Sequence, residues 1–209
     1  MNQKKVENIL IRDLNFNSVA INKLRIFHDE ILLFNKRYNL ISKNTEEDIW
    51  YRHILDSAQL IKYIDFSDND SLADLGSGAG LPGIVLSIFN DNEKFHVKLY
   101  DKSNVKCEFL NKVVKKLDIK AKIINGLINQ QNIDSKYVIC RAFRKLDHIL
   151  GISREIIKVN HKLIILKGKN AIKEINELPE KVKYRYELNK SITNEESKII
   201  IFDIKKDTK

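Results

Sequence analysis

Cysteine is scarce in this sequence, and no apolar run approaches the length of a membrane span. The two cysteines, Cys107 and Cys140, are too few and too far apart for a disulfide framework or a zinc site, so we expect them to be core residues in a reducing compartment. No signal-peptide core follows the first residues, Met1–Lys5. These features predict a cytoplasmic protein with no bound metal and no membrane contact.

Glycine is also uncommon, with seven in 209 residues, yet three of the seven fall at positions 76, 78 and 80. They follow a short apolar run, Ser71–Leu75, and precede Pro82, a residue suited to the first turn of a helix. We interpret this stretch as a buried strand, a tight turn and a helix start. A turn of this kind leaves no β-carbon between the main chain and a ligand.

The glycine spacing excludes two common phosphate-binding motifs. Leu81 stands where the dinucleotide fingerprint requires its third glycine, and no Gly-Lys-Ser/Thr follows for a P-loop. Asp74, just before Gly76, is an acid where a pyrophosphate would be repelled. The pattern favours a ligand that has a nucleoside and an amino group but no phosphates, with Asp74, Gly76 and Gly78 among its contacts.

An acidic residue, Asp101, closes the next predicted strand at 95–100. In a doubly wound sheet, a carboxylate at the tip of the second strand lies beside the first turn and accepts hydrogen bonds from both ribose hydroxyls. A glycine turn alone is about as consistent with a purely structural loop as with a nucleoside-binding turn. Turn and acid together, separated by roughly 20 residues as the dinucleotide rule expects, favour an adenosine cofactor.

Hydrophobic periodicity and end signals predict the other elements. We expect three helices before the first strand, the second capped by Ser18 and the third capped by Thr45 and extending to Ile61. Later helices are expected over 84–89, 104–117, 145–159 and 171–178, and strands over 121–124, 137–140, 162–166, 182–188 and 198–204. The fold class is therefore α/β: a helical extension over residues 1–65, and one compact unit over 66–209 whose mostly parallel, seven-stranded sheet ends in an antiparallel hairpin.

Two basic residues, Arg141 and Lys167, stand at the tips of predicted strands. Ligands bind outside the carboxyl ends of the strands in such sheets. Arg141 could hold a carboxylate or a phosphate in a bidentate grip, or it could form an ion pair with Asp74 or Asp101. The histidines, His53 among them, are scattered, and we expect them to be structural or solvated.

The formal net charge is +9, and the lysines and arginines are spread over the whole chain. This charge is compatible with a polyanionic partner, because each neutralised phosphate releases counterions. Base composition of the genome offers another source of lysine in a chain this rich in Lys, Asn and Ile. The charge therefore supports a nucleic-acid partner without establishing one.

Four stretches together resemble the ribosomal RNA small subunit methyltransferase G family, also called glucose-inhibited division protein B. They are Arg52-His53-Ile54-Leu55-Asp56-Ser57, Asp74-Leu75-Gly76-Ser77-Gly78-Ala79-Gly80-Leu81-Pro82-Gly83, Cys140-Arg141-Ala142-Phe143 and Leu166-Lys167-Gly168. The resemblance runs in order from about residue 25 to the C-terminus. It implies the Rossmann-like fold of class I methyltransferases, with residues 66–209 as the methyltransferase domain. It also implies S-adenosylmethionine-dependent methylation of guanine N7 in 16S ribosomal RNA, in a loop near the decoding region.

Carried over by position, the resemblance implies cofactor contacts at Gly76, Leu81, Ile128, Asn129 and Arg141. The chain departs from the family pattern in two places. The family usually has an arginine and a glutamate in the loop after the third strand, where this chain has Leu127 and Asn129, and an arginine near Ser197. The implied partners are 16S ribosomal RNA and the small ribosomal subunit, bound by a monomer.

Guanine N7 carries a lone pair and no proton, so its methylation needs no general base. Catalysis then reduces to positioning, and we expect Arg141 and Lys167 to seat the guanine or its phosphate while Arg52 engages flanking RNA. Alternatives remain: a methyltransferase for another base, a protein or a small molecule, or an RNA-binding module that binds cofactor without turnover. A nicotinamide-dependent oxidoreductase is disfavoured by Leu81 and Asp74.

Overall fold

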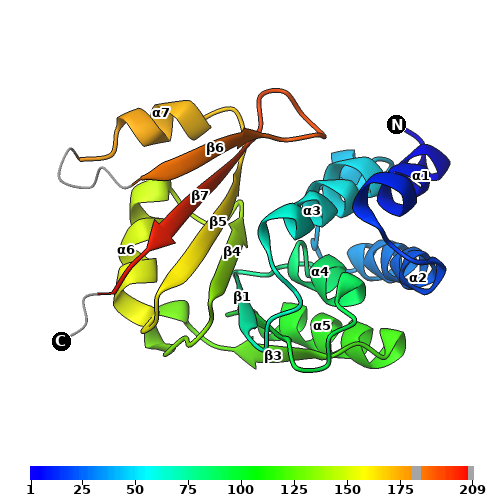
Figure 1. Ribbon diagram of the computed structural model, residues 1–209. Helices are drawn as coiled ribbons and strands as arrows, with labels where there is room; N and C mark the ends of the chain where they lie inside the picture. The colour runs from blue at the N-terminus through cyan, green and yellow to red at the C-terminus, as the bar shows by residue number, and fades with distance from the viewer. Residues whose placement is uncertain (180–184, 207–209) are drawn as a thin grey trace.

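The computed structural model describes residues 1–179 and 185–206, and a seven-stranded sheet forms its centre (Figure 1). The strand order is β3-β2-β1-β4-β5-β7-β6. β7 runs antiparallel to both of its neighbours, β5 and β6, and all other pairs are parallel. The strands are β1 (Ser71–Leu75), β2 (His96–Asp101), β3 (Ala121–Asn125), β4 (Tyr137–Arg141), β5 (His161–Lys167), β6 (Tyr186–Lys190) and β7 (Lys198–Ile204). The predicted fold class, a mostly parallel sheet that ends in an antiparallel hairpin, is confirmed.

The strand that we expected over 182–188 is only partly testable, because residues 180–184 lie outside the described part of the chain. The described strand, β6, continues to Lys190. β6 and β7 are joined by a loop over residues 191–197, called here the hairpin loop. Since Lys198 pairs with Lys167, the hairpin loop lies at the edge where the parallel strands end.

The central strands are buried on both faces, which explains their near-continuous apolar sequence. All five residues of β1 are buried, and alternate residues enter different cores: Leu72 joins the core on one face and Ala73 the core on the other. β1 pairs with β2 and also with β4, so the strand order reverses at β1. In open α/β sheets such a reversal opens a crevice at the carboxyl ends of the strands.

Helices cover both faces of the sheet. The core on one face takes in α4 (Gly83–Phe89) and α5 (Asn104–Leu117), while the other core takes in α6 (Leu146–Ile156) and the start of α7 (Ala171–Asn176). Pro82 immediately precedes α4, so this helix begins one residue after the proline.

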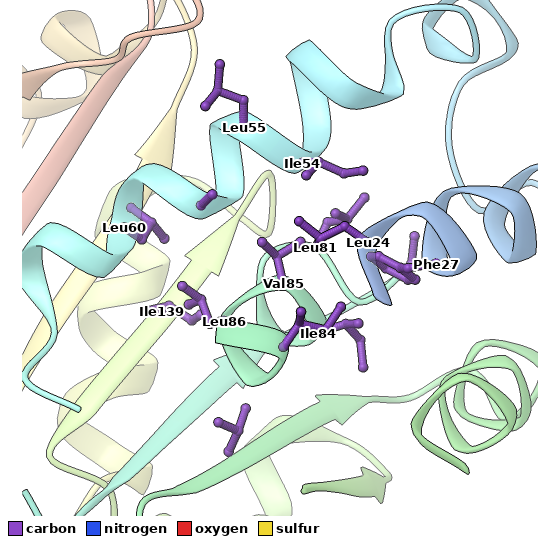
Figure 2. Close-up of a cluster of buried hydrophobic side chains, with 14 of the residues drawn as sticks. Leu24, Phe27, Ile54, Leu55, Leu60, Leu81, Ile84, Val85, Leu86 and Ile139 are labelled. Carbon is purple, nitrogen blue, oxygen red and sulfur yellow. The ribbon is translucent and has the colours of Figure 1, made fainter. Parts of the chain in front are cut away.

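The N-terminal helices join the first of these cores. α1 (Gln3–Leu14) and α2 (Ser18–Asn35) are followed by a π-helical segment, η2 (Ile49–Leu55), then α3 (Asp56–Ala58) and the 3₁₀ turn η3 (Gln59–Tyr63). Figure 2 shows Leu24 and Phe27 of α2 and Ile54 of η2 beside Leu81 and Ile84. One buried cluster therefore crosses residue 65, and the proposed boundary there stays a prediction.

Two predicted helix starts are wrong. α2 is capped by Asn17, whose side chain accepts the backbone N–H of Ala20, so Ser18 is already inside the helix. The expected third helix is not one α-helix capped by Thr45, because Thr45 ends a separate 3₁₀ turn, η1 (Lys43–Thr45), and its hydroxyl contacts His53. The helical segment that follows starts at Ile49 with π-helical hydrogen bonding.

Both cysteines are buried and free. Cys107 lies on α5 and Cys140 on β4, and burial raises the pKa of each thiol. Across the described ranges, no helix is long and apolar enough to cross a membrane. The same residues contain no group of three or more His, Cys, Asp or Glu side chains that could hold a metal ion.

Candidate cofactor site

The glycine turn after β1 is held by the end of β2. The backbone N–H groups of Gly76 and Ser77 donate to the carbonyl oxygen of Tyr100 at 2.9 and 3.0 Å. Gly76 has a φ of +72°, in the left-handed region that side chains other than glycine rarely adopt. The N–H of Gly78 donates to Oδ2 of Asp101 at 2.8 Å. The predicted pairing of turn and acid is therefore a direct contact.

Asp101 also fixes the start of α5. Its Oδ1 accepts the backbone N–H of Ser103 at 2.9 Å, and the Ser103 side chain caps the helix by accepting the N–H of Lys106. The Asp101 side chain is largely buried but reaches a cavity. A carboxylate offers about four acceptor positions, and the two bonds to Gly78 and Ser103 leave room for two hydroxyl donors.

A cavity of about 490 Å³ opens between the ends of β1, β2, β3 and β4. This volume lies within the usual range for small-molecule sites. Four of the predicted cofactor residues line it: Gly76, Asp101, Ile128 and Asn129. The other lining residues are Tyr100, Lys102, Lys106, Gly126, Leu127, Gln130, Ala142, Phe143 and Arg144. The structure thus brings the glycine turn, the acid and the loop after β3 around one space.

Asp74, Gly78 and Leu81 are not among the residues that line this cavity. Asp74 is 1% exposed, and its Oδ2 accepts the N–H of Gly83 at 3.0 Å, which ties β1 to the start of α4. Burial raises the pKa of Asp74 to about 7. Leu81 packs into the apolar cluster of Figure 2. The direct contacts of these three residues with a cofactor stay predictions.

Arg141 lies at the tip of β4 and turns toward the N-terminal helices. Its ion pair is with Asp56 at 3.3 Å, so the alternative of an ion pair with Asp74 or Asp101 is wrong. Its other partners are the Arg52 carbonyl and the His53 ring. Arg141 does not line the cavity, although the next residue does. Its proposed contact with cofactor or guanine therefore remains a prediction.

Lys167, at the tip of β5, is engaged within the protein. Its Nζ donates to the Arg144 carbonyl at 2.6 Å and to Oε2 of Glu174 at 2.7 Å, and its side chain is 10% exposed. Glu174 also accepts the backbone N–H of Leu146. These bonds join the loop after β4 to α7, and the role of Lys167 in seating a guanine remains a prediction.

Sequence reasoning missed Phe143 as a wall of the cavity. A β-carbon added to Gly76 would lie 2.4 Å from Cδ2 of Phe143, so the ring packs directly against the glycine turn. The loop reaches this position through Ala142, whose φ is +48°. Phe143 belongs to the Cys140–Phe143 stretch that resembles the family. Its position in the cavity wall depends on the left-handed backbone of Ala142, and no residue type in the sequence signals that conformation.

Two other hollows lie away from the carboxyl ends of the parallel strands. One, of about 270 Å³, includes Asn17, Phe66 and Phe89. The other, of about 490 Å³, includes Ser71 and His96, the first residues of β1 and β2. Ligands of doubly wound sheets bind at the opposite ends of the strands, so we place the candidate site at the cavity beside Asp101.

Comparison with known proteins agrees with the family resemblance. A family model described as rRNA small subunit methyltransferase G matches residues 20–200. The chain belongs to this family. Among relatives of the rRNA small subunit methyltransferase G family, a protein of that name from Rickettsia rickettsii (strain Sheila Smith) is 44% identical over 180 residues, covering 86% of this chain and 92% of the relative. One from Rickettsia bellii (strain OSU 85-389) is 41% identical over 181 residues, covering 87% and 92%.

Solved structures support the fold of this family member. A SAM-dependent methyltransferase from Aquifex aeolicus has a TM-score of 0.57 at 15% identity, covering 71% of this chain and 88% of that one. A variant of MtNAS in complex with S-adenosylmethionine has a TM-score of 0.57 at 10% identity, covering 97% and 84%. At such low identities the likeness shows the class I methyltransferase fold alone.

Proposed function

We propose that the cavity beside Asp101 binds S-adenosylmethionine and that the protein transfers the methyl group to N7 of a guanine in 16S ribosomal RNA. Membership of the rRNA small subunit methyltransferase G family supports both the reaction class and the acceptor. The structural observation that carries the cofactor assignment is the bond from Gly78 N–H to Asp101 Oδ2, because it joins the glycine turn and the acid in one wall of the cavity.

The lining residues fit a nucleoside with no phosphate of its own. The remaining acceptor positions on Asp101 suit the ribose hydroxyls, and Ile128 and Asn129 supply an apolar face and an amide for the adenine. The Phe143 ring adds an aromatic wall next to Gly76. When bound, S-adenosylmethionine supplies an electrophilic methyl group on a positively charged sulfur.

The chain's own contribution to transfer is positioning. Guanine N7 presents its lone pair on the major-groove edge and carries no proton, so no side chain has to act as a base there. Holding two reactants in line removes most of the entropic barrier to their encounter. A glycine turn fixed by Tyr100 and Asp101, and an aromatic wall at Phe143, provide such a frame.

The rim of the cavity carries positive charge suited to RNA. Three of its lining residues are cationic, Lys102, Lys106 and Arg144, whereas Asp101 is its one acidic lining residue within the described chain. Phosphates of a bound RNA would be attracted to this rim, and the net charge of +9 adds a long-range attraction. We propose that the protein acts as a monomer in the cytoplasm, on the small ribosomal subunit or its RNA.

The proposal is tested by supplying methyl-labelled S-adenosylmethionine and small ribosomal subunits from cells that lack the modification. Digestion of the RNA should yield label in 7-methylguanosine at a single 16S position. An Arg141→Ala variant should lose far more methylation than helical content. Absence of label, with cofactor binding still measured by calorimetry, would contradict the acceptor assignment and favour an RNA-binding module without turnover.

A further inference from the structure

A partly buried polar network joins three segments that are far apart in the sequence. Arg141 at the tip of β4 contacts His53 in η2 and Asp56 at the start of α3. Asp56 in turn contacts Ser191 and Thr193 in the hairpin loop. The N-terminal helices, the carboxyl edge of the sheet and the hairpin loop therefore meet at one arginine and one aspartate.

The guanidinium of Arg141 is only partly used by these contacts. Its Nη1 donates to the Arg52 carbonyl at 3.2 Å and to Asp56 Oδ2 at 3.3 Å, and its Nη2 lies 2.7 Å from Nδ1 of His53. Arginine has five N–H donors. Nε–H and one hydrogen of Nη2 have no acceptor within the described part of the chain. Two neighbouring guanidinium donors fit the two oxygens of a carboxylate or phosphate.

The protonation of His53 follows from its partners. Arg141 can only donate, so Nδ1 of His53 accepts, and the ring proton lies on Nε2. Nε2 then donates to Oγ1 of Thr45 at 2.9 Å, and the Thr45 hydroxyl donates to the Ser42 carbonyl at 2.8 Å. Burial, together with the charges of Arg141 and Arg52, lowers the pKa of His53 to about 3. The ring is neutral at physiological pH and stays an acceptor for Arg141.

Asp56 of α3 binds the same guanidinium and is itself held by residues of the hairpin loop. One carboxylate oxygen, Oδ2, takes the ion pair with Arg141, while Oδ1 accepts Thr193 Oγ1 at 2.7 Å, Ser191 Oγ at 3.2 Å and Gln59 Nε2 at 2.9 Å. Gln59 also accepts the N–H of Ile192 at its Oε1. With one oxygen saturated by neutral donors, the other is held in place toward Arg141.

We propose that His53 and Asp56 are positioning residues that hold Arg141 as a two-donor receptor for an anionic group at the mouth of the cavity. Arg141 directly precedes Ala142, which is part of the cavity lining. The anionic group is a carboxylate or a phosphate, supplied by the cofactor's amino-acid end or by the RNA backbone. This inference rests on the proposed function and assigns His53 a role that its position alone did not indicate.

Two variants of similar size distinguish the roles of the two ring nitrogens of His53, Nδ1 toward Arg141 and Nε2 toward Thr45. His53→Asn places an amide oxygen near the Nδ1 position and so preserves the acceptor for Arg141. His53→Gln reaches the Nε2 position, so it preserves the bond to Thr45 and removes the acceptor. We expect His53→Gln to weaken binding of the anionic ligand roughly tenfold, as loss of one bond to a charged group predicts, and His53→Asn to stay near wild type. Equal losses in both variants, or no loss in His53→Gln, would overturn the proposal.

Two sets of measurements distinguish the cofactor's carboxylate from an RNA phosphate as the source of the anion. Affinities for S-adenosylmethionine and for its decarboxylated form are measured by calorimetry, and KM for small ribosomal subunits is measured in the methylation assay. If the cofactor's carboxylate is bound, His53→Gln weakens S-adenosylmethionine but not the decarboxylated form. If an RNA phosphate is bound, KM for the subunits rises and both cofactor affinities stay unchanged.

If His53→Gln does not fold, the milder variant Thr45→Val provides the test. Thr45→Val removes the acceptor that fixes the ring and should shift the same binding constant in the same direction by a smaller factor. An unchanged constant in Thr45→Val would then count against the positioning role. An active wild type with unaffected variants overturns this inference alone, whereas a wild type that neither binds cofactor nor methylates overturns the proposed function as well.

Discussion

Gly76 is the position where one added methyl group tests the cavity most directly. A β-carbon there would lie 2.4 Å from the Phe143 ring, and the backbone φ of +72° is already unfavourable for alanine. We expect Gly76→Ala to displace Phe143 or the turn and to weaken binding of S-adenosylmethionine by at least tenfold. Isothermal calorimetry measures the change.

The matched control is Gly151→Ala, on the exposed side of α6. Apart from its chain neighbours and the backbone of its own helix, no atom of the described residues lies within 4 Å of a β-carbon added to Gly151. Alanine in a helix interior is about 1 kcal/mol more favourable than glycine, so this variant should be slightly more stable and should bind cofactor normally. Equal cofactor affinities for the Gly76 and Gly151 variants would mean that the turn beside Phe143 is not part of the site.

Asp74 should make stability depend on pH in an unusual direction for an acid. Its pKa in the folded protein is about 7, against an ordinary value of 3.8, because burial disfavours the charged form. The folded chain therefore binds more protons than the unfolded chain between these values, and this contribution to stability falls as pH rises through that window.

An Asp74→Asn variant removes this ionisation and retains an oxygen for the N–H of Gly83. Relative to the parent, its melting temperature should rise steadily from pH 4 to about pH 7 and then level off, as scanning calorimetry across the window can measure. A difference between the two proteins that does not change with pH would show that Asp74 ionises at its ordinary pKa.

At the scale of elements, α2 and α5 are joined through one buried acid. The Glu30 side chain is 4% exposed and forms ion pairs with Lys112 at 2.8 Å and Lys116 at 2.5 Å. Burial opposes its ionisation, but the two lysines outweigh burial, so the pKa of Glu30 lies below its ordinary value of 4.5. This pairing contributes stability above that pH and loses it as pH falls.

Replacing both lysines by alanine should therefore destabilise the protein by about 1–3 kcal/mol at neutral pH, because a buried carboxylate loses its partners. Urea unfolding measures the loss, which should shrink once acid protonates Glu30. Lys115→Ala, on the exposed face of α5, is the control and should have little effect. A loss no larger than that of the control would mean that the Glu30 pairs contribute nothing to stability.

The sheet was predictable because hydrophobic runs and turn signals mark its central strands. The match is poorer at β6, which is mostly exposed and continues two residues beyond the expected end at Leu188, to Lys190. The irregular helical segment around η2 was not predictable, because residues 49–61 have ordinary helical periodicity. The actual hydrogen-bond pattern there depends on tertiary contacts, such as that between His53 and Thr45. Propensity and periodicity contain no information on such contacts.

The candidate site was predictable to a similar degree. The pairing of the glycine turn with Asp101 followed from topology, and the structure shows it as a hydrogen bond. The cavity wall at Phe143 and the partners of Arg141 did not follow, because both depend on where loops from distant parts of the chain meet. Sequence spacing places the tips of strands but not the side chains of the loops beyond them.

At the scale of the whole molecule, the N-terminal helices complete a core that the sheet does not complete alone. Leu24, Phe27 and Ile54 cover Leu81 and Ile84 (Figure 2). A chain of residues 66–209 would expose that apolar surface, so we expect it to aggregate or to lack a cooperative thermal transition. Scanning calorimetry with size-exclusion chromatography tests this. A sharp transition for a monomeric 66–209 fragment would instead establish the boundary near residue 65 as a true domain limit.

The two buried thiols, Cys107 and Cys140, make it possible to follow local unfolding of the native protein by chemical modification. Cys107 sits on a helix at one face of the sheet and Cys140 on a central strand, both shielded from water. A thiol-modifying reagent can react with either one only after local or global unfolding exposes it. The rate of modification at Cys107 would report how often α5 detaches, and the rate at Cys140 how often the sheet opens at β4. Both rates can be measured without introducing a labelling site by mutation.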